Sequence, residues 1–481
     1  MLPKNKFIHI TLQLFIFAVL VAPGCRKAVE VGVPPTNLVS ASVFSSNSTA
    51  IAAVTGMYQQ VVGSSFAGNT SQGYYSLTSL AGLSADEFAL YSNAPSALQQ
   101  AYSNSLKSNS SPFPLWSSLY NCIYLSNSAL AGLSSSTGVT PSVKSQLMGS
   151  CYFIRAFCNF YLVNMFGDVP LATSPNYATN NATARTPKAL VYQQIVIDLS
   201  NAQSLLGGNF TSLSGTGTAE RTLPTQGAAM GLLARTYLYL GKYDSAKTMA
   251  TGVINNTSIY KLVLNPDSVF LKNSTEAIWQ LPPVQTGYNT PDGYTYVLTA
   301  GPNTGSNPIY LSTQLLNAFE LGDLRKTHWV ATYSATYSYA YKYKVKGGPA
   351  NTAITEYYMV LRLAEQYLIR AEAEAALGDS VNAILDLNVI RSRAHLTAYT
   401  PTINGPLLPA ILHERQVELF AEWGHRWLDL NRTGAVNNVL GNPGNVCLAK
   451  GGTWSPNWSV YPVPFTDISV DPNLTQNNGY N

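Results

Sequence analysis

Charged residues are scarce in this chain. They make up 11% of its 481 residues, against about 25% in an average globular protein. The net charge is only +4 and the basic residues are dispersed along the chain. A nucleic-acid-binding protein concentrates its basic residues on one face, so we exclude nucleic acid as a partner. A surface rich in Asn, Ser, Thr and Tyr instead suits an uncharged ligand.

Cysteine is also rare, with five in the chain. Cys151 and Cys158 are seven residues apart on a predicted helix, which separates their backbones by about 10 Å and rules out a bond between them. We expect these two, with Cys122 and Cys447, to be buried free thiols, because four cysteines are too few for a disulfide scaffold.

The chain has one long apolar run, and it lies at the N-terminus. Two lysines precede the apolar stretch from Ile10 to Ala22. This stretch is too short to span a bilayer and is typical of a secretory signal. A small residue stands immediately before Cys25, as at a lipoprotein processing site. We therefore predict a lipoprotein signal peptide over residues 1–24 and lipid attachment at Cys25.

Catalytic and cofactor motifs are missing. No GXSXG, Walker loop or dinucleotide fingerprint occurs between a predicted strand and a predicted helix. His413 and Glu414 would open an HEXXH zinc motif, but Val417 stands where the second histidine is needed. We therefore predict no metal, no cofactor and no enzymatic activity.

A stripe of three glutamates is the strongest acid–base candidate. Glu414, Glu418 and Glu422 are four residues apart and would share one face of a helix. Arg415 and Arg426 lie close in sequence, and such cations lower the pKa of a carboxyl group. A structural ion-pair network is therefore the favoured interpretation.

A glycoside hydrolase is the catalytic alternative. Such an enzyme needs two carboxyl groups facing each other across a cleft, one with a raised pKa. The possible pairs are Glu418 with Glu422, and Asp86 with Glu87. Adjacent residues on a strand point to opposite faces, which weakens the second pair.

Apolar periodicity predicts a mainly α protein. In the first amphipathic segment, Ile51, Val54 and Tyr58 recur at helical spacing. The predicted helices are Ser48 to Val62, Trp116 to Leu133, Ser142 to Phe166, Ala189 to Leu206, Gln226 to Leu240 and Leu407 to Asn431.

Two of the helical regions resemble each other. The positions Ala234, Leu240, Gly241 and Ala246 recur, at one constant spacing, as Ala371, Leu377, Gly378 and Ala383. In both, a helix ends at glycine and a small residue opens the face of a second helix. This pattern predicts helical hairpins of the tetratricopeptide type, in which small residues let antiparallel helices approach closely. Two unrelated helix–turn–helix units remain the alternative.

Tyrosine is abundant, with 30 residues against 7 tryptophans. Two long segments, 63–114 and 281–343, carry few helix signals, and long loops are commonly functional. An aromatic face packs against a sugar ring while the tyrosine hydroxyl bonds outward. The predicted ligand-binding residues are Tyr74, Tyr75, Asp86, Tyr91, Tyr102, Tyr288, Tyr294, Tyr296 and Tyr310. The alternative is that these tyrosines only pack the loops onto the helices.

Seven segments in one order carry a family resemblance. They are IRAFCNFYLVNMFGDVPL from Ile154, RTPKALVYQQIVIDLSNA from Arg185, GAAMGLLARTYLYLGKYDSA from Gly227, VLRLAEQYLIRAEAEAALG from Val360, LNVIRSRAHL from Leu387, HERQVELFAEWGHRWLDLNRTG from His413, and the closing YPVPFTDISVDPNLTQNNGY. Together they resemble the SusD/RagB-like nutrient-binding lipoproteins of the Bacteroidetes outer membrane. The resemblance covers nearly the whole mature chain.

The resemblance implies a mainly α fold of tetratricopeptide-like hairpins, with a loop-rich ligand-binding half and few short strands. We expect a tether and strap over 25–47, an N-terminal helical region over 48–280, and a C-terminal region over 281–481 with its ligand loops at 281–345. In this family the binding residues lie in variable loops, which correspond here to about 86–102 and 288–310.

The resemblance also implies a function. Members bind a nutrient without cleaving it and pass it to a SusC-like TonB-dependent transporter. We therefore expect a lipid-anchored protein on the exterior of the outer membrane that binds an oligosaccharide or other small nutrient. Uptake of peptides is the alternative within the same family.

Overall fold

The computed structural model describes residues 40–68, 70–109, 114–303, 307–347 and 353–480. The predicted signal peptide, Cys25 and most of the predicted strap therefore lie outside the described residues.

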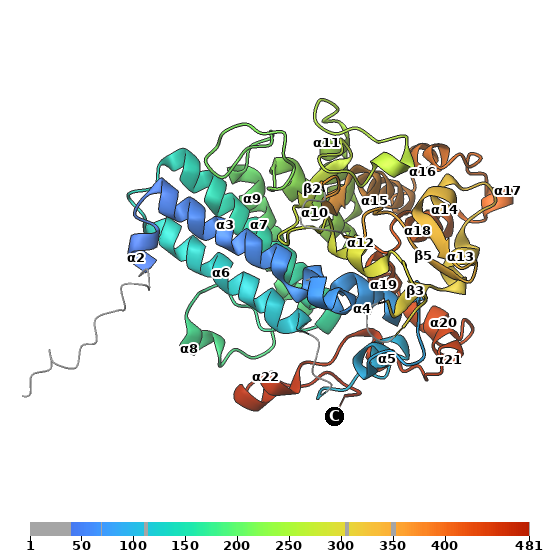
Figure 1. Ribbon diagram of the computed structural model, residues 1–481. Helices are drawn as coiled ribbons and strands as arrows, with labels where there is room; N and C mark the ends of the chain where they lie inside the picture. The colour runs from blue at the N-terminus through green and yellow to red at the C-terminus, as the bar shows by residue number, and fades with distance from the viewer. Residues whose placement is uncertain (1–39, 69, 110–113, 304–306, 348–352, 481) are drawn as a thin grey trace, which may run out of the picture.

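Helices dominate the architecture (Figure 1). They are α2 (Ser40–Val43), α3 (Asn47–Gly63), α4 (Leu77–Ser84), α5 (Ser96–Tyr102), α6 (Leu115–Ser135), α7 (Pro141–Phe166), α8 (Tyr177–Asn180), α9 (Lys188–Leu205), α10 (Gln226–Tyr239), α11 (Tyr243–Ile254), α12 (Pro291–Tyr296), α13 (Thr313–Ala318), α14 (Leu324–Trp329), α15 (Leu363–Ala376), α16 (Ser380–Arg393), α17 (Pro401–Asn404), α18 (Leu407–Glu418), α19 (His425–Arg432), α20 (Val436–Leu440), α21 (Val446–Ala449) and α22 (Phe465–Val470). The mainly α prediction is confirmed.

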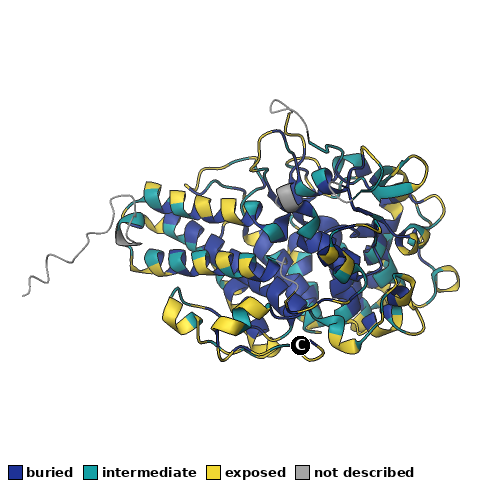
Figure 2. Ribbon diagram, turned by 60° about the horizontal axis from the view of Figure 1, so that its bottom comes forward, coloured by how far each residue is buried: buried dark blue, intermediate teal, exposed yellow. Residues whose placement is uncertain are grey.

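The long helices α3, α6, α7 and α9 form one elongated half of the molecule (Figure 1). Helix α7 lies between α6 and α9, and it is buried on all sides from Gly149 to Phe166, apart from half-buried Tyr152. A helix that is buried on all sides lies in the centre of a core, and the buried Arg155 of α7 is paired with Asp198. The helices that surround α7 carry their exposed residues on one side only, as Figure 2 shows.

The predicted helical hairpins are present. Helix α10 packs against α11, and α15 packs against α16. Gly241 and Gly378 end the first helix of each pair with φ of +65° and +85°, a left-handed conformation that glycine adopts without steric cost. Ala234 and Ala371 are fully buried at the hairpin contacts, as close helix approach requires.

Few strands occur among the described residues, and all are short, as predicted. They are β1 (Phe88–Leu90), β2 (Ala277–Leu281), β3 (Ile309–Leu311), β4 (Val330–Tyr333), β5 (Tyr337–Ala340) and β6 (Tyr358–Arg362). They form three antiparallel pairs, β1 with β3, β2 with β6 and β4 with β5. The β1–β3 pair joins the two tyrosine-rich segments, which are far apart in the sequence.

The predicted single helix from Leu407 to Asn431 is wrong. Helix α18 ends at Glu418 and α19 begins at His425. Between them Ala421 and Trp423 have φ of +52° and +46°, values that a helix does not contain. The Trp423 ring is buried and stacks on Tyr358 at 4.9 Å, so packing of this ring overrides the local helix preference.

The cysteine prediction is confirmed, since Cys122, Cys151, Cys158 and Cys447 are buried free thiols. Every helix within the described residues is too short or too polar to cross a lipid bilayer.

Candidate functional site

The β1–β3 pair has one inner and one outer face. Phe88 opposes Leu311, and Leu90 opposes Ile309, and all four are buried. Ala89 opposes Tyr310 on the other face, because side chains alternate along a strand. Tyr91 continues this outer face, since its backbone N–H donates to the carbonyl oxygen of Pro308 at 2.8 Å. The ladder therefore presents Tyr91 and Tyr310 outward.

Two further tyrosines complete this outer surface. The rings of Tyr310 and Tyr337 meet edge to face, with centroids 5.3 Å apart. Burial raises the pKa of Tyr102, and the nearby Tyr310 raises this pKa further. Tyr102, on α5, therefore lies beside the β1–β3 pair. All four side chains are half-buried. We call Tyr91, Tyr102, Tyr310 and Tyr337 the tyrosine face.

The side chain of Lys450 contacts the tyrosine face at Tyr102. The Nζ of Lys450 lies 5.0 Å from the centre of the Tyr102 ring. It also donates to the carbonyl oxygens of Leu83, at 2.6 Å, and Ala85. Burial lowers the pKa of Lys450 to about 8. The ring of Tyr102 is thus held by a cation–π contact.

The β4–β5 hairpin adds tyrosines that our site prediction omitted. Tyr333 opposes Tyr337 in the ladder, and Tyr339 meets Tyr341 edge to face at 5.7 Å. The signal was present in the sequence, because tyrosine alternates with other residues at 337, 339, 341 and 343. Such period-two alternation is typical of a strand with one distinct face.

The remaining predicted tyrosines form two pairs near α12. Tyr288 and Tyr294 meet at 4.9 Å, and Tyr288 lines a pocket of about 170 Å³. Tyr74 and Tyr75 meet at 4.8 Å. Their segment, Thr70–Tyr75, packs on α12. The structure therefore brings the two predicted loop segments together, and these tyrosines are half-buried.

Tyr296 differs from the other predicted tyrosines. It is 2% exposed, stacks on Phe88 at 5.0 Å and shares a 2.8 Å hydrogen bond with the hydroxyl of Ser79. Its ring and hydroxyl are both satisfied inside the protein. The prediction of ligand contact by Tyr296 is therefore corrected, and for this residue the packing alternative describes the structure.

Asp86 is also satisfied internally. Its carboxylate accepts two hydrogen bonds of 2.7 Å from Arg426, and the residue is 4% exposed. Its backbone oxygen accepts from Ser312, which follows β3. We therefore correct the ligand assignment of Asp86, which instead fastens β1 to α19 and to the end of β3.

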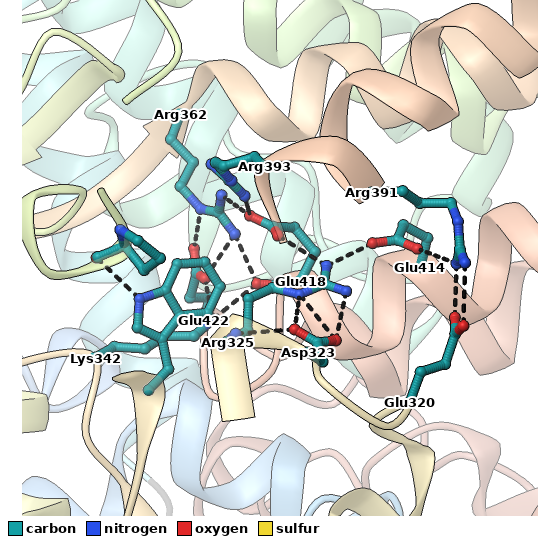
Figure 3. A network of polar contacts seen from close by, with 12 residues as sticks. Glu320, Asp323, Arg325, Lys342, Arg362, Arg391, Arg393, Glu414, Glu418 and Glu422 are labelled. Carbon is teal, nitrogen blue, oxygen red and sulfur yellow. Dashed lines mark hydrogen bonds and ion pairs between the residues drawn. The ribbon is translucent and has the colours of Figure 1, made fainter. Parts of the chain in front are cut away.

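The glutamate stripe lies in a buried charge cluster (Figure 3). Glu418 is fully buried and pairs with Arg325 at 3.1 Å, and with Arg362 and Arg393. The remaining partners in the cluster are Glu276, Glu320, Asp323, Lys342, Arg391, Glu414 and Glu422. The predicted ion-pair network is present.

The cations of this cluster are not the predicted ones. Arg415 pairs with Asp429 at 2.8 Å, and Arg426 pairs with Asp86. Arg415 is next to Glu414 on α18, and adjacent side chains leave a helix about 100° apart. Arg426 lies on α19, beyond the turn that follows Glu418. Tertiary folding supplies arginines from distant segments in their place.

The cluster reaches the strand that carries Tyr337. Lys342 stands two residues after β5, and its Nζ pairs with Glu422 and donates to the Glu418 carbonyl oxygen at 2.9 Å. The Nζ also lies 4.1 Å from the centre of the Phe420 ring. Buried charges therefore anchor the end of the hairpin whose outer side contributes to the tyrosine face.

The candidate hydrolase pairs have unsuitable surroundings. Burial alone would raise the pKa of Glu418, but the charges of Arg393, Arg362 and Arg325 hold this pKa well below its usual range. Burial, with the neighbouring Asp86 charge, raises the pKa of Glu87 to about 8. Glu87 is 1% exposed and has no access to a substrate.

Comparison with known proteins agrees with this architecture. The SusD family model matches residues 323–480, and a second model, described as "Starch-binding associating with outer membrane", matches residues 42–238. A curated relative, SusD-like protein P2 of Formosa agariphila, is 26% identical over 76% of this chain and 80% of its own length.

Solved structures share the fold. A SusD superfamily protein from Bacteroides vulgatus superposes with a TM-score of 0.76 at 23% identity, covering 90% of this chain and 99% of that one. A laminarin-binding SusD-like protein gives 0.73 at 23% identity, covering 91% of this chain and all of that one. The chain belongs to the SusD-like family.

Proposed function

We propose that this protein binds a neutral oligosaccharide on the tyrosine face and delivers it, uncleaved, to a SusC-like TonB-dependent transporter. The observation that carries the proposal is the convergence of Tyr91, Tyr102, Tyr310 and Tyr337 from three separate segments onto one outer surface. All four side chains are half-buried, so part of each remains accessible to a ligand.

The chemistry of this surface favours a sugar. Aromatic rings bury the C–H face of a pyranose, and phenolic hydroxyls exchange hydrogen bonds with its hydroxyl groups. The cations nearest to the face are engaged, Lys450 with backbone oxygens and Arg426 with Asp86. A neutral ligand therefore matches the surface better than an anion. The laminarin-binding relative supports the same ligand class.

Binding without cleavage is supported by the state of the carboxyl groups. Glu418 and Glu422 are ion-paired in the interior, and Asp86 is engaged by Arg426. None of the three can serve as a general acid beside the tyrosine face, because each is surrounded by cations that stabilise its ionised form.

Anchoring and delivery rest on the family. The matched family description places such proteins in association with the outer membrane, and the N-terminal sequence is typical of a lipoprotein. We propose that Cys25 carries the lipid and that the protein faces the cell exterior. The test is affinity purification from native outer membranes, with co-purification of a TonB-dependent barrel as the expected result. A Cys25→Ala variant should be released from the membrane.

Calorimetric titration of the purified protein tests the ligand class. The panel contains laminarin and starch-derived oligosaccharides, a charged oligosaccharide and an oligopeptide mixture. We expect one neutral oligosaccharide to bind and to remain intact after overnight incubation. Peptide binding in the absence of sugar binding would support the alternative uptake function, and release of shorter sugars would show catalysis.

Variants of the tyrosine face test the site. Tyr310→Ala should weaken binding by about 1–3 kcal/mol, as expected for a central aromatic anchor. Tyr310→Phe should keep most of the affinity, because the ring remains. The matched control is Tyr243→Ala, which removes a half-buried tyrosine on α11, outside the tyrosine face. Equal affinity of wild type and Tyr310→Ala would refute the site.

A further inference from the structure

A second hollow lies away from the tyrosine face. It has a volume of about 370 Å³ and is lined by α6, by the segment around α8, and by α22 with the residues that follow it. These three elements lie side by side at the lower left of Figure 1, whereas β3 and β5 lie at the right. We call this hollow the α6–α22 pocket. None of the predicted ligand residues lines it.

The floor of the α6–α22 pocket is aromatic and rigid. Trp116 and Tyr120 are four residues apart on α6 and share one helix face, with ring centroids 4.9 Å apart. The Tyr120 hydroxyl donates to the Pro170 carbonyl oxygen at 2.7 Å. The Trp116 Nε1–H donates to the Asp467 carboxylate at 3.2 Å. Both rings are thereby fixed before any ligand arrives.

The rim offers exposed rings and amides. Tyr124 continues the α6 stripe and is 48% exposed, and Tyr177 on α8 is 73% exposed. Both exposed rings line the same pocket, so they form one accessible aromatic surface. Asn121 and Asn181 lie on the same rim and are exposed. The rim can therefore stack on a ring and hydrogen-bond to hydroxyl groups.

Two carboxylates that accept hydrogen bonds but form no ion pair with any described residue line the pocket. Its lining contains the carboxylates of Asp467 and Asp471, and no lysine, arginine or histidine is present among the described lining residues. Neither aspartate forms an ion pair within the described part of the chain. Burial raises the pKa of Asp467 despite its hydrogen bonds from Thr466 and Trp116. A bound cation would relieve this cost.

We propose that the α6–α22 pocket binds a cationic amino sugar, with its ring between Tyr124 and Tyr177 and its ammonium group at Asp467 and Asp471. Aromatic rings and carboxylates both attract an ammonium group, and the rim amides match the sugar hydroxyls. The volume suits one or two sugar units. This site is independent of the tyrosine face, which presents no free carboxylate.

A matched pair of ligands tests the charge requirement. Short oligomers of glucosamine and of N-acetylglucosamine share ring and linkage, but acetylation removes the positive charge. Titration of the purified protein should show at least tenfold tighter binding of the glucosamine oligomer. Its affinity should fall as salt rises from about 50 to 500 mM, because salt screens the charge interaction. Equal affinity for both oligomers, or no binding of either at millimolar concentration, overturns the proposal.

Variants of the pocket locate the binding. Asp467→Asn keeps the shape and an acceptor for Trp116, and should remove the preference for the glucosamine oligomer. Tyr124→Ala should weaken binding of the glucosamine oligomer at least fivefold through loss of the ring. The control Asp244→Asn removes an exposed carboxylate on α11. It should change neither the affinity for the glucosamine oligomer nor the preference for it over the acetylated oligomer. Unchanged binding in both pocket variants, with folding verified by circular dichroism, also overturns the proposal.

Discussion

The buried charge cluster and the tyrosine face meet at β5 and have opposite relations to water. Glu418 and its arginines are excluded from solvent, so each charge depends on a partner inside the protein. Tyr310 and Tyr337 are half-buried and need no internal partner for their hydroxyls. Charge thus holds the scaffold together, and neutral aromatic rings occupy the surface where we propose that an uncharged ligand binds.

This difference explains how an irregular region can present an ordered surface. The segment 281–345 contains only short helices and strands, which are marginal in isolation. Lys342 ties the end of β5 to Glu422, and Asp86 ties β1 to Arg426. Ion pairs on one side of these strands fix the tyrosines on the other. Three substitutions and a change of pH test how far the tyrosine face depends on the charge cluster.

The largest effect is expected from Glu418→Ala. This change removes the carboxylate that Arg325, Arg362 and Arg393 share, so each buried arginine loses one of its ion pairs. Breaking a buried ion-pair cluster by removing one partner costs about 3–5 kcal/mol, measured as the free energy of unfolding in urea. Glu220→Gln is the control, because the ion pair of Glu220 with Lys272 is 3.8 Å long and well exposed. This substitution should lower the free energy of unfolding by less than about 1 kcal/mol. Similar losses in both variants would contradict a special role for the cluster.

Acid should weaken the charge cluster in a defined pH window. The folded-state pKa values of Glu418 and Glu422 are held below the usual carboxyl range by Arg362 and other cations, against the effect of burial. Groups with lowered pKa contribute full stability above the unfolded-state pKa, about 4.3 for glutamate, and lose it as pH falls through the folded-state values. Unfolding free energy should therefore drop below about pH 4.

An acid titration of the Glu418→Gln variant beside the wild type tests whether Glu418 causes the loss of stability. The Glu418→Gln variant should show a shallower decline of unfolding free energy below about pH 4 than the wild type, because one titrating carboxyl is missing. An identical pH dependence in both proteins would assign acid sensitivity to other carboxyl groups.

The Lys342→Met substitution tests the link between the two regions. Methionine keeps the length and the apolar contact with Phe420. Glu422 keeps its pair with Arg362, and the Glu418 carbonyl oxygen keeps its hydrogen bond from Arg362. We expect a loss of about 1–2 kcal/mol in unfolding free energy and a several-fold loss of sugar affinity. Unchanged affinity would show that the tyrosine face is ordered without this anchor.

The smallest effect on stability is expected from Tyr337→Ala. The side chain is half-buried and its main contact is the Tyr310 ring, so unfolding free energy should fall by about 1 kcal/mol or less. Sugar affinity should fall by a larger amount, because a stacking ring is lost. Thermal unfolding and titration on the same preparation separate the two quantities. A stability loss that exceeds the affinity loss would make Tyr337 a packing residue.

Sequence patterns predicted the regular parts of the fold well. The observed α3 and α9 begin and end within one residue of the predictions, because apolar spacing and capping are local properties. The paired Gly241 and Gly378 identified both hairpins for the same reason. Helix α18 was predicted too long, since the positive φ angles at Ala421 and Trp423 follow from burial of a ring against Tyr358, a residue far away in the chain.

The candidate site was predictable only in part. Composition and family resemblance directed attention to the tyrosine-rich segments, and β1 and β3 bring Tyr91 and Tyr310 onto one face. Which tyrosine faces outward depends on strand register, and register depends on pairing partners that are far apart in sequence. Helix packing decides the same question on α12, where Tyr296 is internal although Tyr294, two residues earlier, is half-buried.

The helical hairpins, the low charge content and the family resemblance could be inferred from the sequence, because each depends on composition or on residues close together in the chain. The arginines that neutralise Glu418, the tyrosines that reach solvent and the pocket between α6 and α22 became evident only from the folded chain. Those outcomes depend on contacts between segments that lie from 25 residues apart, as for Arg393 and Glu418, to 351 residues apart, as for Trp116 and Asp467. At such separations burial and charge pairing outweigh local preference.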